Sequence, residues 1–148
     1  MKTIKQFKNT QDHVFASIFC EEDQGMLMDV WSIQQKGDYD LKTVFGYCFE
    51  KFEENNIHFW LCDELKLEAY LQQDGAQAKH LLRKSIVGSN LQKVSLVCRN
   101  PEASAAHMCR DFIASCGVQV DIFKNNVLAM RWLTDNQSAL NSPYMAAV

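Results

Sequence analysis

Eight charged or amide side chains lie at or just after segments with strand character, where they could bind a ligand or a partner. In parallel α/β sheets, ligands and partners meet the carboxyl ends of the strands, where loops converge. A set of mixed charge suits a polar ligand or a loop of another protein. The competing interpretation is that Asp38, Asn100 and Asn125 only cap helices and that the lysines are solvated. The predicted binding residues are Lys36, Asp38, Asp63, Glu64, Arg99, Asn100, Lys124 and Asn125.

The sequence carries no motif that is specific for catalysis or for metal binding. His58, one of four histidines, lies in an apolar segment, where a buried, hydrogen-bonded histidine is the commoner outcome. No His-x-x-His or Cys–His spacing indicates zinc, and neither a Gly-x-Ser-x-Gly elbow nor a phosphate loop is present. We therefore predict a protein that is not an enzyme and that uses no cofactor or metal, with an uncharacterised enzyme as the weaker alternative.

The six cysteines lie within apolar patterns, and no two of them have a Cys-x-x-Cys spacing. Because the amino terminus lacks the apolar core of a secretion signal, we expect reduced, buried cysteines in a cytoplasmic protein. Cys62 and Cys98 each lie near the end of an expected strand and could form a thiol pair. Packing as small hydrophobic side chains is the more common role of such residues.

Length and composition predict one globular domain and exclude several classes of partner. The 148 residues fit a single domain, and 47% apolar with 22% charged residues is ordinary for a globular protein. The net charge is −3 and no basic stripe is visible, so we do not expect nucleic-acid binding. No apolar run approaches the roughly 18–20 residues that span a bilayer, so we expect no membrane association.

The segment from Ile57 to Asp63 predicts a central strand, because its large apolar residues suit burial on both faces of a sheet. Residues 14–20 and 26–33 predict a hairpin closed by Gly25. The apolar stripe from Leu41 to Phe52 has helical spacing, and Asp38 is the expected cap. The further expected elements are an extended or irregular stretch at 64–73, a helix at 76–86, a strand at 91–98, a helix beginning at Asn100-Pro101-Glu102, a strand at 118–123 and a helix capped by Asn125 or Asn126.

These elements predict an α/β fold in which an N-terminal β-hairpin is followed by alternating helices and strands. Such alternation favours a mostly parallel sheet with right-handed crossovers, here of five strands covered by about four helices. Residues 13–134 would form the single domain. Residues 1–12 and 135–148 would be a loosely ordered arm and tail. The tail and the hydrophobic residues around Trp132 suggest a homodimer.

Several segments give residues 13–134 a resemblance to the small bacterial STAS-like proteins, which are similar in fold to anti-sigma-factor antagonists. They are the hairpin, the helix after it, Phe59–Asp63, Lys93–Val97 and Ala129–Leu133. The resemblance implies a mixed sheet backed by helices and a non-enzymatic role. Better-known members bind a partner kinase and are switched by phosphorylation of a Ser or Thr in the loop after the equivalent of Asp63. Residues 63–70 contain neither, so we do not expect that switch here.

The leading functional hypothesis is therefore a regulatory or protein-interaction module. The alternative is a module that binds a small apolar ligand, lipid-like or a nucleotide, since the many aromatic residues and methionines could line a pocket. Glu21, Glu22 and Asp23, together with Asp63 and Lys124, faintly resemble the acidic pocket of a response-regulator receiver. A receiver has a helix after its first strand, whereas this chain has Gly25 and a second strand, so the receiver hypothesis is the weakest.

Overall fold

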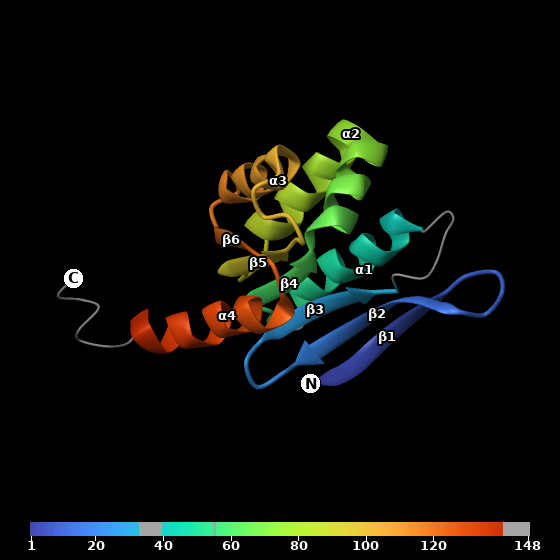
Figure 1. Cartoon of the computed structure of the whole chain (residues 1–148). Coiled ribbons are helices and arrows are strands. Elements are labelled where there is room, and N and C mark those ends of the chain that lie inside the picture. The colour runs from blue at the N-terminus through green and yellow to red at the C-terminus, as the bar shows by residue number, and fades with distance from the viewer. Residues whose placement is uncertain (33–39, 55, 141–148) are drawn as a thin grey trace.

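The computed structural model describes residues 1–32, 40–54 and 56–140 and shows an α/β fold built on one sheet. Its six strands follow one another across the sheet in the order in which they occur in the chain (Figure 1). The first three pair antiparallel, and the third to the sixth pair parallel. The strands are β1 Lys2–Lys8, β2 Val14–Glu21, β3 Met26–Trp31, β4 Phe59–Asp63, β5 Lys93–Val97 and β6 Gln119–Phe123.

The sheet is mixed and has six strands, so the expected mostly parallel sheet of five strands is wrong. The additional strand is β1, in the part of the chain that was expected to be a loose arm. Its register shifts between Thr3 and Lys5, which places Ile4 and Phe7, three residues apart, against the same core. A regular strand is recognised in a sequence by apolar residues that alternate with period two. The bulge breaks this alternation, so the sequence shows no sign of β1.

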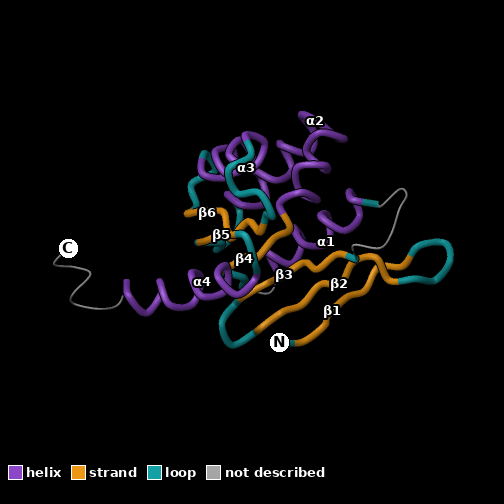
Figure 2. The backbone as a smooth tube through the Cα atoms, in the orientation of Figure 1, coloured by secondary structure: helices purple, strands orange, loops and turns teal. Residues whose placement is uncertain are grey.

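Helices α1 Leu41–Glu54, α2 Glu64–Val87 and α3 Ser104–Ala114 cover one face of the sheet, and α4 Asn126–Leu140 lies against the other (Figures 1 and 2). This arrangement follows from the strand order. Each of the first three helices connects two neighbouring parallel strands, and right-handed crossovers in one direction place all three on the same face. Only α4, which follows the last strand, is free to cover the opposite face.

The predicted central strand is confirmed as an interior strand, between β3 and β5. Trp60 and Cys62 pack into the core on the side of α1 and α2, whereas Phe59 and Leu61 pack with Ala129 of α4. These four residues of β4 are all nearly inaccessible to solvent. Burial on both faces explains why the segment is a nearly continuous apolar run.

The hairpin is confirmed, and its turn requires a glycine. Gly25 has φ +65°, and its carbonyl oxygen accepts hydrogen bonds from the N–H groups of His58 (2.7 Å) and Phe59 (3.0 Å). A Cβ at this position would lie 2.8 Å from the His58 ring. The turn between β2 and β3 therefore also fixes the start of β4.

Residues 64–73, expected to be extended or irregular, form the first half of α2, which continues through the expected helix at 76–86. The alternation that begins at Leu65 is misleading, because the Leu65 side chain is 57% exposed. The buried apolar residues of this stretch are Leu67, Tyr70 and Leu71, which have helical spacing. Gly75 interrupts this helix with non-helical dihedral angles, φ 56° and ψ −128°.

Three helix boundaries differ from the expected ones. Asp40 caps α1 through the N–H of Thr43 (3.1 Å), and the expected cap Asp38 lies outside the described residues. Helix α3 starts at Ser104 rather than at Asn100, whose carbonyl oxygen instead closes a turn. Helix α4 extends to Leu140, six residues into the expected tail, while residues 141–148 lie outside the described part.

Candidate functional site

A groove of about 670 Å³ lies where strands β4, β5 and β6 end, and we call it the carboxyl-edge groove. Its lining includes Asp63 after β4, Arg99 after β5, and Lys124 and Asn125 after β6. The structure therefore brings together four of the eight predicted binding residues. Parallel strands that end at one edge account for this clustering.

Two of the other four predicted residues, Glu64 and Asn100, do not line the groove. Glu64 is buried, with 1% of its surface exposed, and Asn100 lies in the exposed turn before α3. Lys36 and Asp38 lie outside the described residues. A position after a strand at this edge therefore does not by itself bring a residue into the groove.

Positive charge dominates the carboxyl-edge groove. Among the described residues of the lining, Lys66, Arg99 and Lys124 contribute three positive charges and Asp63 one negative charge. Their formal net charge is +2, in a chain whose total is −3. Within the described part of the chain, Arg99 and Lys124 form no ion pair. The Lys66 ammonium lies 5.7 Å from the centre of the Trp31 ring, which forms part of the same wall. The groove is thus suited to an anionic occupant.

Asp63 and Asn125 both cap helices, but the competing interpretation expected this only of Asn125; Asn100, which it also named, does not cap α3. The Asp63 carboxylate accepts a hydrogen bond from the Lys66 N–H (3.1 Å) and caps α2, while Asn125 Oδ1 accepts from the Leu128 N–H (2.9 Å) and caps α4. Burial raises the pKa of Asp63, and the Lys66 N–H and the nearby Arg99 charge oppose that rise. Arg99 and Lys124 have no such structural role, so they carry the case for a site.

A buried carboxylate beneath the groove was missed in the sequence. Asp29 Oδ2 accepts hydrogen bonds from Trp31 Nε1 (2.8 Å) and from the Asp63 N–H (3.2 Å), and Oδ1 accepts from Trp60 Nε1 (2.8 Å). Burial raises its pKa to about 6, and the hydrogen bonds oppose that rise. The available signal was its position between Leu27 and Trp31, which places a carboxylate on the buried face of a strand.

Glu64 is a second buried carboxylate and lies close to residues of the groove wall. Its Oε1 atom has no hydrogen-bond partner among the residues that the structure describes, and the side chain also contacts the thiol of Cys98, which lines the groove. Burial raises the pKa of Glu64 to about 7. A carboxyl group with this pKa could transfer protons near neutral pH, but its enclosure gives it no direct access to an occupant of the groove.

The thiols of the proposed pair are buried and poorly suited to react. Burial raises the pKa of Cys98, and it raises the pKa of Cys62 even further. Their sulfur atoms contact backbone carbonyl oxygens, of Asp63 for Cys62 and of Asn100 for Cys98. The thiolate is the reactive form, so these surroundings favour packing over redox chemistry.

The described histidines do not contribute to this groove. The His58 ring, half-buried rather than fully buried as expected, contacts the Asn90 carbonyl oxygen (3.2 Å), and His107 Nε2 contacts that of Pro101 (3.0 Å). Among the residues that the structure describes, no cluster of His, Cys, Asp or Glu is placed to hold a metal ion. The described helices include none that could cross a membrane.

A third buried charge lies at the opposite end of the parallel strands. Lys93, the first residue of β5, is 3% exposed, and its Nζ atom has no hydrogen-bond partner among the described residues. The ammonium lies 5.2 Å from the centre of the Trp132 ring of α4, and burial lowers the pKa of the lysine. The aromatic face partly compensates for the lost hydration.

Comparison with known proteins gives no match: no family model, no curated protein and no solved structure is significantly similar to this chain. The STAS-like resemblance therefore remains a prediction from the sequence pattern.

Proposed function

We propose that this protein is a non-enzymatic regulatory module of STAS-like type that binds an acidic segment of a partner protein in the carboxyl-edge groove. The observation that carries the proposal is the pair Arg99 and Lys124, two cationic side chains that follow neighbouring strands and form no ion pair in the described part of the chain. Aspartate, glutamate or a carboxyl terminus of the partner would supply the missing negative charges.

The surroundings of these cations favour a protein over a small metabolite. Leu65, which is 57% exposed, lies beside Lys66 in the groove lining, and Trp31 adds an aromatic surface. Apolar and aromatic residues combined with arginine are typical of the core of protein interfaces. A partner loop could bury Leu65 and place its carboxylates against Arg99 and Lys124.

The proposed module works without the phosphorylation switch of the better-known STAS-like proteins. The segment after Asp63 has no Ser or Thr up to Tyr70, and it forms the first two turns of α2. Regulation would then depend on the concentration of the partner and on competition for the groove rather than on a covalent change.

Charge reversal within the groove tests the proposal. An Arg99→Glu/Lys124→Glu variant should bind a fluorescently labelled oligoglutamate peptide roughly tenfold more weakly than the wild type at low salt. The matched control is Lys42→Glu/Lys84→Glu, which changes the net charge by the same amount at two exposed positions outside the groove. Equal weakening of both variants would show that only net charge matters and would contradict the proposal.

The same variants test whether the site is used in the cell. Proteins captured from a lysate of the source organism should include a partner that the wild type and the control variant retain and that the groove variant loses. If every captured protein is retained equally by all three baits, the groove is not the partner site.

A further inference from the structure

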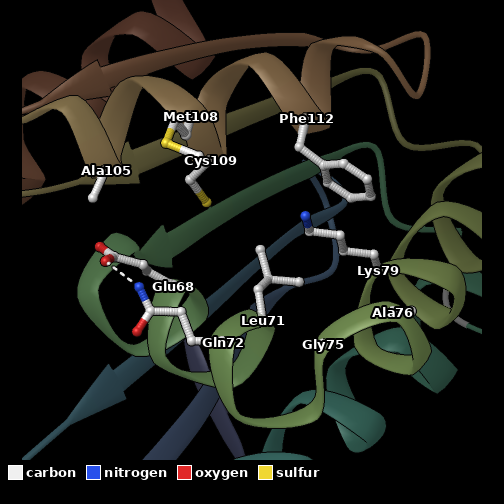
Figure 3. A pocket seen from close by; sticks show the side chains of 10 residues that line it. All are labelled: Glu68, Leu71, Gln72, Gly75, Ala76, Lys79, Ala105, Met108, Cys109 and Phe112. Carbon is white, nitrogen blue, oxygen red and sulfur yellow. Dashed lines mark hydrogen bonds between the residues drawn. The ribbon is translucent and has the colours of Figure 1, made fainter.

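A second groove, of about 380 Å³, lies between α2 and α3 and shares no lining residue with the carboxyl-edge groove. We call it the α2/α3 groove. Leu71 forms its floor, with Ala105, Met108 and Phe112 on the opposite wall, and the Cys109 sulfur points into it (Figure 3). Its volume lies at the lower end of the roughly 300–1,000 Å³ of ligand pockets, which fits a small molecule better than a polypeptide segment.

The walls of the α2/α3 groove expose apolar surface to solvent. Met108 is 71% exposed, although most methionines are buried, and Phe112 is only partly buried. Methionine side chains are flexible and adapt to ligands of irregular shape. An apolar chain in this groove would remove both side chains from water, which is favourable in proportion to the area covered.

The break at Gly75 shapes the α2 side of the groove. The helix turns at this residue, between the segment that carries Leu71 and the segment that carries Lys79 (Figure 3). A continuous helix would not place these two segments at this angle to each other. The groove is therefore a consequence of a backbone conformation that glycine adopts readily and other residues avoid.

The polar residues of the groove are arranged so that a cation remains available. Lys79 is exposed, its ammonium lies 5.8 Å from the centre of the Phe112 ring, and it forms no ion pair in the described part of the chain. The Glu68 carboxylate accepts a hydrogen bond from the neutral Gln72 amide (3.0 Å), so it contributes one formal negative charge, but it lies beside Ala105, away from Lys79 (Figure 3). The Arg83 guanidinium, 5.1 Å from the centre of the same Phe112 ring, adds a second positive charge at the Lys79 end. A negatively charged group of a ligand would thus find its complement at Lys79.

We infer that the α2/α3 groove binds a small amphipathic carboxylate, with its apolar chain between Leu71, Met108 and Phe112 and its carboxylate at the Lys79 ammonium. The positive charges of Lys79 and Arg83 at the Phe112 end of the groove favour a negatively charged head group there over a neutral or cationic one. The site is distinct from the partner site proposed above, because the two grooves share no lining residue and use different cations, although α2 contributes to both.

Titration of the full chain with decanoate, below its micelle concentration, tests this assignment by two-dimensional NMR. Saturable shifts are expected at residues of α2 and α3 that line the groove. Decylammonium, which has the same chain with the opposite charge, should bind more weakly. Shifts that do not saturate, that centre on the carboxyl-edge groove, or that are equal for both amphiphiles would overturn the inference.

Matched variants locate the ligand within the groove. Met108→Glu should weaken decanoate binding about tenfold or more. It removes the apolar contact between Met108 and the decanoate chain, and it adds a negative charge that repels the decanoate carboxylate. Val87→Glu is the control, because Val87 is 66% exposed on α2 and does not line the groove. Lys79→Gln should weaken binding about two- to fivefold, and Lys84→Gln, at another exposed position on α2, should leave it unchanged.

Equal affinities in all four variants would overturn the inference. Light scattering addresses the competing occupant, a second copy of the chain. A dimer that Met108→Glu converts to monomer would assign the groove to self-association and would also overturn it.

Discussion

The carboxylate of Asp29 in β3 accepts a hydrogen bond from the backbone N–H of Asp63, 3.2 Å away at the end of β4. This bond connects the interior of the sheet to the residue that caps α2 and lines the carboxyl-edge groove. The same carboxylate also binds the indole N–H groups of Trp31 and Trp60. The ionisation of one buried side chain is therefore coupled to the groove wall and to two fluorescent reporters.

We expect the intrinsic tryptophan fluorescence of the folded protein to change with a midpoint near pH 6. Burial raises the pKa of Asp29 to about 6, and both indole N–H groups donate to its two oxygen atoms, so protonation changes their surroundings. A fluorescence titration under native conditions measures this. In Asp29→Asn, which cannot titrate, the transition should be absent; its persistence with the same midpoint would assign the signal to another group.

Stability should fall as the pH rises from about 5 to 8. The pKa values of about 6 for Asp29 and about 7 for Glu64 in the folded protein exceed the ordinary values of 3.8 and 4.5 of these side chains, so the folded protein binds these protons more tightly than the unfolded chain does. The stabilising contribution is complete below about pH 4 and is lost as the pH rises through 6 and 7. For Asp29 alone, about 1–2 kcal/mol should be lost between pH 5 and pH 8.

Urea denaturation at several pH values checks this expectation. Glu64→Gln should flatten the dependence between pH 5 and pH 8, because it removes one of the two titrating groups. Glu50→Gln, at an exposed position of α1, should leave the dependence unchanged. If the wild type and Glu64→Gln have the same slope, Glu64 is not protonated in the folded state near neutral pH.

Two glycine-to-alanine substitutions should change stability in opposite directions. Gly46 lies within α1, and an added Cβ would meet no atom within 4 Å, so Gly46→Ala should stabilise by about 0.5–1 kcal/mol. Gly75→Ala also has space but must adopt φ 56° and ψ −128°, which costs about 1–3 kcal/mol. Thermal or urea denaturation of both variants measures the difference; stabilisation by Gly75→Ala would mean that the break in α2 is not needed.

The sequence predicted α1 from the helical period of its buried residues, and it predicted the hairpin and the strands β4, β5 and β6 from short runs of apolar residues. All of these elements form near the expected positions. The spacing of apolar residues gave a wrong prediction in two places, the bulged strand β1 and the first half of α2. A bulge in β1 brings Ile4 and Phe7 to the same face, and the exposed Leu65 imitates the alternation of a strand within α2.

The candidate site was predicted to the extent that it depends on topology. Arg99 and Lys124 reach the groove because the strands before them end at one edge of the sheet. Glu64 was misplaced because the residue after Asp63 was expected in a loop, whereas the first turn of α2 turns it into the core. Asp29 and Lys93 depend on tertiary packing, for which one isolated charge in an apolar strand was the only signal.

Strand order in space equals strand order in the chain, from β1 to β6. Each strand after β1 thus pairs with the strand synthesised just before it, so a partner is already present when that strand emerges. During synthesis the sheet can grow in one direction from the hairpin, one crossover helix at a time. Met26, Phe59 and Leu61 lie on the sheet face opposite to α1, α2 and α3. This face is covered only when α4 forms and packs Ala129 and Leu133 against them. A nascent chain that lacks its final helix would therefore present this apolar strip to chaperones or to other unfinished chains.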